Sequence, residues 1–175
     1  LTSLNVGNNP SLAHLDCGST QLTSLDVSNN TELCRLHCTG NQLTSLDVSK
    51  NTSLYDLSCF NNQLTSLDVS KNTELTNLDC RGNHLTRLVV SNNTKLKELT
   101  CNYNNIGYLY LSKNTELEFL NCSFNKIDQL NLSNNTKLTG LYCDDNRLTN
   151  LKLDDNTALI NSDIVNVGSQ SSTRR

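Results

Sequence analysis

The sequence predicts an essentially all-β solenoid, in which two parallel sheets enclose a leucine core and little or no helix is present. Leucine recurs every 21 residues from Leu12 to Leu159, and cysteine follows the same step from Cys17 to Cys143. A fixed period of roughly 20–50 residues is the signature of stacked repeats, so each unit should form one turn. Apolar residues two apart, in segments too short for an ordinary helix, favour strands with one buried side.

We expect a single solenoid domain over residues 1–167. It would consist of a partial repeat at 1–11, seven 21-residue repeats at 12–158 and a degenerate terminal turn at 159–167. The polar residues 168–175 are expected to form a disordered tail. The sequence contains no Met and opens inside a repeat, so we expect a longer parent with an upstream cap or further repeats.

Each unit contains the same pattern twice. Residues 33–41 and 43–51 both read Leu-x-x-Leu-x-apolar-x-x-Asn, and we call such segments the first and second half-repeats. Each half should supply one short strand followed by a tight corner. The corner asparagines form two rows at 21-residue steps, one from Asn41 to Asn146 and the other from Asn9 to Asn156. An inward Asn can satisfy backbone groups of its own turn and the next, so we expect a structural role for both rows.

The pattern breaks after the seventh repeat. Leu159 keeps the phase, whereas Ser162 and Ile164 stand where leucine and cysteine are due. We expect Ile164, Val165 and Val167 to add one last strand over the final turn.

The segment Leu-x-x-Leu-x-Leu/Cys-x-x-Asn is the signature of leucine-rich repeats, and the chain resembles that family over nearly its whole length. The nested 21-residue unit is similar to the bacterial "irreko"-type subclass. This resemblance implies a right-handed leucine-rich-repeat solenoid, classed by family with the α/β horseshoe folds, although these short halves leave no room for helices. It also implies a surface-exposed or secreted bacterial parent and a binding role. It transfers no active-site residue, because the motif contains none.

Seven of the eight cysteines occupy one equivalent inward position. Neighbours in this row should lie about 4.8 Å apart with parallel side chains, a poor match to disulfide torsions. A zinc site needs clustered ligands such as Cys-x-x-Cys, which the sequence lacks. We therefore expect buried free thiols, and neither a metal nor a cofactor. Cys34 lies off the row at an exposed position and is the candidate for a reactive or dimer-forming thiol, the alternative being an incidental surface cysteine.

Charge and hydropathy exclude several classes. A net charge of −3 without a Lys/Arg cluster argues against a nucleic-acid partner. No stretch approaches the roughly 20 apolar residues of a membrane helix, so we expect no membrane insertion. His37 should neighbour Asp16 on the outer surface, but no Ser or Cys nucleophile converges on the pair. We therefore expect that the protein is not an enzyme.

Three aspartates, Asp26, Asp47 and Asp68, should stack in one outward column of the second halves, where like charges repel. A calcium ion could relieve that repulsion. Neighbouring lysines and hydroxyls could do the same, and the sequence leaves these alternatives open.

The outward positions of the first halves vary from repeat to repeat and carry most of the rings. Four rings come from consecutive turns and are expected to form one patch, which is typical of protein or sugar recognition. A competing interpretation is that Phe60 and Phe124, just after cysteines, fold inward and plug the corners. The candidate partner-binding residues are Tyr103, Phe119, Phe124, Tyr142, Arg35, Phe60, Arg81, Glu98 and Asn121.

We expect a non-catalytic protein-binding module of a bacterial surface or secreted protein involved in adhesion or host interaction. Aromatic anchors would supply affinity, and the mixed polar positions around them specificity. One alternative is a passive spacer or stalk, favoured by the monotonous second halves at 22–28, 43–49 and 64–70. The other is a glycan-binding adhesin, because Tyr and Phe also stack on sugars.

Overall fold

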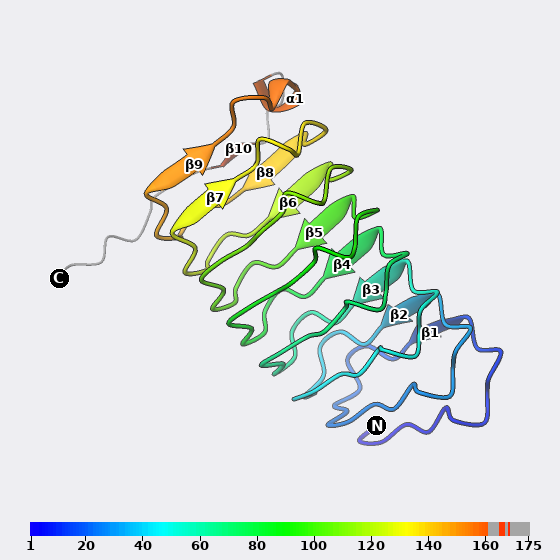
Figure 1. Cartoon of the computed structure of the whole chain (residues 1–175). Coiled ribbons are helices and arrows are strands. Elements are labelled where there is room, and N and C mark those ends of the chain that lie inside the picture. The colour runs from blue at the N-terminus through cyan, green and yellow to red at the C-terminus, as the bar shows by residue number, and fades with distance from the viewer. Residues whose placement is uncertain (161–164, 167, 169–175) are drawn as a thin grey trace.

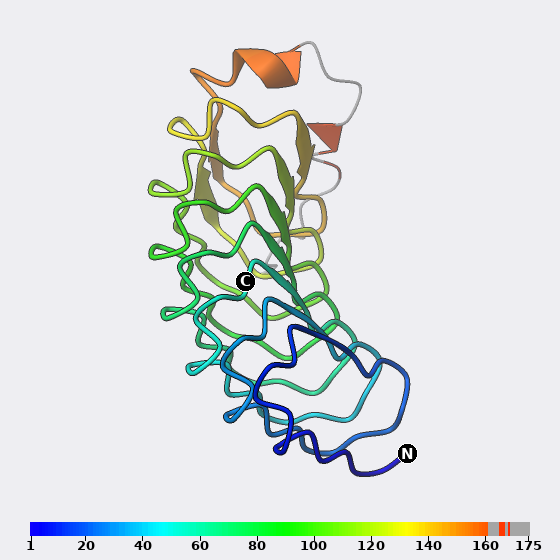
Figure 2. The ribbon, with the colours of Figure 1, turned by 90° about the vertical axis from the view of Figure 1, so that its right-hand side faces the viewer.

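The computed structural model describes residues 1–160, 165–166 and 168 as a stack of similar turns (Figure 1). The first halves of the repeats contribute three-residue strands, namely β1 His14–Asp16, β2 Arg35–His37, β3 Asp56–Ser58, β4 Asn77–Asp79, β5 Glu98–Thr100, β6 Phe119–Asn121 and β8 Gly140–Tyr142. With β10, Val165–Asn166, they form one eight-stranded parallel sheet. Its register follows the repeat, as in the pairing of Leu36 with Leu57. Figure 2 shows the turns stacked in an arc.

The second halves differ from the prediction of a second full sheet. Only β7, Gln129–Asn131, and β9, Asn150–Lys152, pair there. In the five preceding repeats of the described chain, the second half is extended and bonded between turns only at isolated points, such as the N–H of Gln63 to the carbonyl of Leu43 at 2.9 Å. Alternating leucine and valine correctly predicted the buried side, but the same alternation arises in an extended segment without ladder pairing. The period of the sequence therefore predicts which side chains are buried, but not which backbone groups are hydrogen-bonded between turns.

The terminal turn is longer than the others. A four-residue helix, α1 Thr157–Ile160, contains Leu159, which is buried. β10 then pairs with β8 so that Val165 lies opposite Leu141, 24 residues earlier rather than 21. The expectations for Ser162, Ile164, Val167 and residues 169–175 concern positions outside the described residues.

The core confirms the cysteine row. Cys17 to Cys143 lie buried among the leucines at 21-residue steps, and all eight cysteines are free thiols. Burial, with smaller contributions from nearby charges, raises the pKa of Cys17 and of Cys143 to about 11. It raises the pKa of the row members between them well above the ordinary 9.0. Cys34 lies off the row and is half-buried.

Both asparagine rows join consecutive turns, which confirms their structural role. In the first row, Asn62 donates from Nδ2 to the carbonyls of Cys38 and Cys59, each at 3.0 Å. Its Oδ1 accepts the N–H of Leu43 at 3.0 Å. In the second row, Asn72 donates from Nδ2 to the carbonyls of Val48 and Asn51, both in the preceding turn. The Oδ1 atoms of this row, from Asn30 to Asn156, have no hydrogen-bond donor within the described residues. The first row therefore satisfies one more buried backbone group per turn.

We expect Asn62→Ala to destabilise the protein more than Asn72→Ala. The first change leaves the buried N–H of Leu43 without its acceptor, while the carbonyls of Cys38 and Cys59 each keep one other asparagine donor. The second change leaves no backbone group unpaired, because the two carbonyls that Asn72 bonds also accept backbone N–H groups. Each buried group left unsatisfied costs about 1–3 kcal/mol. Urea unfolding measures both, with the exposed Thr52→Ala as control. Equal losses for the two asparagines would contradict this account of the rows.

Stability should fall as the pH rises above about 9. Thiols of the unfolded chain then lose protons that the buried thiols retain, because their folded pKa is raised, so alkaline pH favours unfolding. Below that pH both states hold these protons and the thiols add no pH dependence. Urea midpoints at pH 8 and pH 10 test this expectation. Cys80→Ala/Cys101→Ala should reduce the decline, and an unchanged decline would assign it to other groups.

Candidate functional site

The parallel register places the variable outward residues in two columns on the sheet. We call the outward side of β1–β6 and β8 the sheet face. One column comprises His14, Arg35, Asp56, Asn77, Glu98, Phe119 and Gly140, and the other Asp16, His37, Ser58, Asp79, Thr100, Asn121 and Tyr142. Neighbours within a column come from consecutive repeats, so a substitution in one repeat changes the surface at one level of the stack.

Asp56 organises the N-terminal part of the sheet face. Its Oδ2 lies 3.2 Å from Nε of Arg35 and 3.2 Å from Nε2 of His37. Arg35 also donates from Nη2 to the hydroxyl of Tyr55 at 3.1 Å. His37 does neighbour Asp16 in register, but the carboxylate it contacts is that of Asp56 in the next turn. In this part of the sheet face, the polar side chains are therefore bonded to one another.

A second cluster lies at the corner after β3 and β4. The guanidinium of Arg81 stacks on the ring of Phe60, with Cζ 4.2 Å from the ring centroid. Its Nε lies 3.6 Å from Oδ2 of Asp79. Burial raises the pKa of the Asp79 carboxyl, against the effects of the hydrogen bond and charge of Arg81. Phe60 is covered by Arg81 and half-buried, so it does not plug the corner in the predicted way.

Phe119 and Tyr142 form an aromatic pair on β6 and β8. Their ring centroids are 5.9 Å apart, with the planes inclined by 54°. Gly140 lies directly opposite Phe119 in the register, and a Cβ there would come within 2.6 Å of Cδ2 of the ring. The absence of a side chain at Gly140 therefore allows the Phe119 ring to lie across the neighbouring strand.

Tyr103 and Phe124 form another pair, at the corner that follows β5 and β6. Their rings are stacked, 4.3 Å between centroids and 8° between planes, and are 55% and 39% exposed. Phe124 thus does not fold inward. Both residues adopt left-handed backbone, with φ of 54° and 52°. The equivalent position in other turns holds small or short polar residues, namely Ser19, Gly40, Asn61, Gly82 and Asp145, all with positive φ.

The sequence-predicted residues therefore form several clusters. Among the described residues, the ring contacts join Tyr103 to Phe124 and Phe119 to Tyr142, but not one pair to the other. Glu98 is exposed and neighbours Phe119 in register. Asn121 lies between Phe119 and the corner and accepts the N–H of Ser123 at 3.2 Å. Arg35 lies four turns away from Phe119 in the same column.

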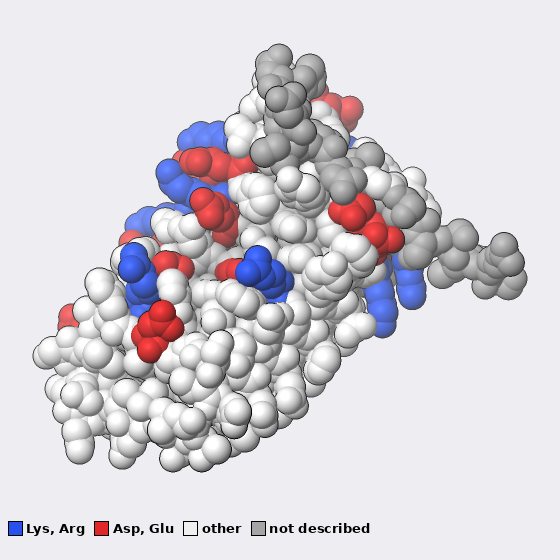
Figure 3. Space-filling model, turned by 180° about the vertical axis from the view of Figure 1, so that it is seen from behind, with Lys and Arg blue, Asp and Glu red and all other residues white. Residues whose placement is uncertain are grey.

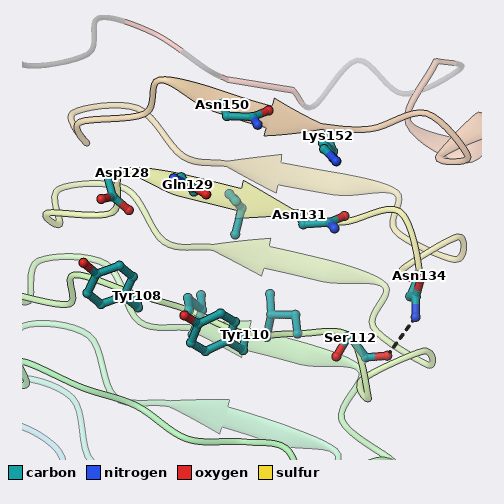
Figure 4. A pocket seen from close by; sticks show the side chains of 12 residues that line it. Tyr108, Tyr110, Ser112, Asp128, Gln129, Asn131, Asn134, Asn150 and Lys152 are labelled. Carbon is teal, nitrogen blue, oxygen red and sulfur yellow. Dashed lines mark hydrogen bonds between the residues drawn. The ribbon is translucent and has the colours of Figure 1, made fainter.

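The prediction did not include a feature of the second-half side. Tyr108 and Tyr110 are 60% and 78% exposed, and their rings are parallel within 4° with centroids 6.5 Å apart. They border a groove of about 670 Å³ that continues over β7 and β9 (Figure 4). The sequence does indicate this groove, because Tyr110 occupies the same column as Asp47 and Asp68 but is aromatic.

The aspartates of that column cap their own backbone. Oδ1 of Asp26, Asp47 and Asp68 each accepts the N–H of the serine two residues later at 2.9 Å. These hydrogen bonds hold the pKa of all three carboxyls below the usual range. No set of three or more His, Cys, Asp or Glu in the described part of the chain converges in a metal-binding arrangement. On the side seen in Figure 3, charges of both signs lie in small groups.

These features define the chain as a leucine-rich-repeat protein of the bacterial type. It is similar to the functional domain of InlJ from Listeria monocytogenes, which includes a cysteine ladder, at 42% identity with a TM-score of 0.93. The match covers 99% of this chain and 38% of that one, so the chain spans well under half of the InlJ domain.

Two further solved structures share the fold. The internalin InlF of Listeria monocytogenes is 22% identical, with a TM-score of 0.81 over 95% of this chain and 50% of that one. The ectodomain of the receptor kinase GASSHO1/SCHENGEN3 from Arabidopsis thaliana, solved in complex with CASPARIAN STRIP INTEGRITY FACTOR 2, is 23% identical, with a TM-score of 0.75 over 87% and 21%. No family model and no curated protein match the sequence. Within the described residues, no helix is long and apolar enough to cross a membrane.

We expect Gly140→Ala to displace the ring of Phe119, because the new methyl group would occupy its position. Overpacking of this kind costs about 1–3 kcal/mol. Near-UV circular dichroism and urea unfolding measure the two effects. Gly107→Ala is the matched control, since nothing lies within 4 Å of a Cβ there. The interpretation fails if both variants behave alike.

Proposed function

We propose that this chain is a non-catalytic protein-binding module of a bacterial surface or secreted protein, with its partner on the C-terminal part of the sheet face and the adjoining corner. Adhesion and host interaction are the roles that such a module would serve. One leucine-rich-repeat neighbour, the receptor ectodomain, was solved in complex with a partner, and this supports a binding role.

The observation that carries the proposal is the stacked pair Tyr103–Phe124. A bulky residue in the left-handed region costs about 1–2 kcal/mol relative to glycine, so two of them in consecutive turns oppose stability. Other turns place Gly40 and Gly82 at this position. A scaffold selected for stability alone has no reason to retain two rings here, half-exposed and stacked in water. A partner that covers them does supply a reason.

The neighbouring pair extends the same argument. Phe119 and Tyr142 lie half-buried on the sheet. Glu98 neighbours Phe119 across the strands, and Asn121 lies two residues along the same strand. Aromatic anchors with a polar surround match the composition of protein interfaces. The rigid sheet holds these side chains in place, so little ordering would be needed on binding.

Capture of partners from host and bacterial surface extracts tests the proposal. We expect the unmodified chain to capture a partner protein. The Phe119→Ala/Tyr142→Ala and Tyr103→Gly/Phe124→Gly variants should not capture it. The glycine variant should be as stable as the unmodified chain or more so, because it relieves two left-handed aromatic residues. Thr44→Ala/Thr65→Ala, exposed on the second-half side, is the control that should retain the partner.

Other outcomes have definite meanings. Equal capture by all variants, or no specific capture, would reject the interface and favour a passive spacer or stalk. Attachment to target cells that survives protease treatment would favour a glycan ligand over a protein. A glycine variant less stable than the unmodified chain would show that the corner rings support the fold.

A further inference from the structure

The second-half side of the stack changes character after the third full repeat. In the column of Asp26, Asp47 and Asp68, the next members are Val89, Tyr110, Asn131 and Lys152. The adjacent column changes from serine to Arg87, Tyr108, Gln129 and Asn150. The charged and hydroxyl surface of the early repeats is therefore replaced first by Arg87 and Val89, then by two tyrosines, with amides and one amine beyond them. The amides lie on the only part of the described second-half side where strands pair, β7 with β9, which begins one turn beyond the tyrosines.

The two tyrosines form a flat platform. Figure 4 shows both rings presenting a face in the same direction, side by side along one extended segment. Their planes agree within 4° and the centroids are 6.5 Å apart. At 60% and 78% exposure, these rings leave much of their apolar surface in water. An exposed aromatic surface of this kind marks a binding site more often than a random surface position.

Hydrogen-bonding groups surround this platform on the next two turns. Gln129 pairs with Asn150 in the register, and Asn131 with Lys152 (Figure 4). Asn131 accepts the N–H and the hydroxyl of Ser133 at 3.1 and 2.7 Å, which orients its amide. Asn134 is oriented in the same way, by donating from Nδ2 to the carbonyl of Ser112 at 3.2 Å. The groove is thus lined by amides, of which those of Asn131 and Asn134 are held by hydrogen bonds.

The groove carries little net charge, with Arg87 on the other side of the two tyrosines. Its lining contains one acidic residue, Asp128, and one basic residue, Lys152. Oδ1 of Asp128 is buried without a protein hydrogen-bond donor. A charged peptide, a phosphate or a nucleic acid would find little net attraction here.

We propose that the groove bordered by Tyr108 and Tyr110 is a second binding site, for a neutral pyranose oligosaccharide of two or more residues. The C–H face of a pyranose is flat and weakly apolar, which matches a tyrosine ring, and its rim of hydroxyls both donates and accepts hydrogen bonds. Amides offer a donor and an acceptor in one group and therefore match hydroxyls in pairs. Two rings side by side accommodate two consecutive sugar units. This site is separate from the protein interface proposed above and does not depend on it.

The architecture explains why the site lies here. Ladder pairing of β7 and β9 fixes the spacing of Gln129, Asn131, Asn150 and Lys152, whereas earlier second halves carry no such pairing in the described chain. Leu109, Leu111 and Leu130 point into the core and anchor the segments beneath. The groove is therefore formed before a ligand arrives, as small-ligand sites usually are.

Isothermal titration of the whole chain with maltohexaose, cellohexaose and N-acetylchitohexaose tests the proposal. We expect at least one of these neutral hexasaccharides to bind, and its affinity to fall at least tenfold in Tyr108→Ala/Tyr110→Ala. Tyr103→Ala/Phe124→Ala removes a comparable ring pair elsewhere and should leave the affinity unchanged. Because the chain contains no Trp, tyrosine fluorescence offers a second readout of binding.

A second variant separates recognition from folding. Asn131→Ala/Asn150→Ala keeps both rings and should weaken binding at least threefold, with urea unfolding confirming that each variant is folded. Failure of all three sugars to bind would overturn the proposal. So would equal affinity in Tyr108→Ala/Tyr110→Ala, or an equal loss in Tyr103→Ala/Phe124→Ala.

Discussion

The buried corner asparagine is the interaction on which the whole structure depends. A chain that turns twice every 21 residues around a dry leucine core must bury backbone N–H and carbonyl groups at each corner. Asn62 and its equivalents satisfy these groups in two consecutive turns, with bonds of 3.0 Å. Leucine could fill the same space but could not make these bonds. Because each turn is tied only to its neighbours, the stack can extend by repetition.

This arrangement separates what stabilises the protein from what the protein presents. Leucines, cysteines and asparagines occupy the inward positions in every full repeat, so the outward positions carry few demands beyond solubility. The sheet face consequently changes from a polar cluster around Asp56 to the aromatic pair of Phe119 and Tyr142 while the strand register stays the same. One scaffold thus presents different chemistry at different levels of the stack.

The two sides of each turn are not equivalent, although their sequences follow the same Leu-x-x-Leu-x-apolar-x-x-Asn pattern. A continuous ladder joins the first halves, whereas the second halves pair only at β7 and β9. The site residues follow this difference. Rings on the sheet face rest on a uniform sheet, while Tyr108 and Tyr110 border the place where second-half pairing begins. Departures from the repeat therefore gather toward the C-terminal turns on both sides.

The sequence alone determined the period, the inward residues, the outward columns and the free state of the cysteine row. These features depend on spacing, and a 21-residue step converts directly into register, as the pairing of Leu36 with Leu57 shows. Spacing could not predict which extended halves would pair, because alternating burial is the same with or without a ladder.

Only the tertiary structure decided how the side chains meet. His37 contacts Asp56 rather than Asp16, Arg81 lies over Phe60, and the four expected rings form two pairs. Such contacts depend on rotamers and on neighbours one turn away, such as the space above Gly140. The strain at Tyr103 and Phe124 likewise became visible only through backbone angles. The repeat thus specifies the scaffold, and the packing of individual outward side chains specifies the surfaces offered for binding.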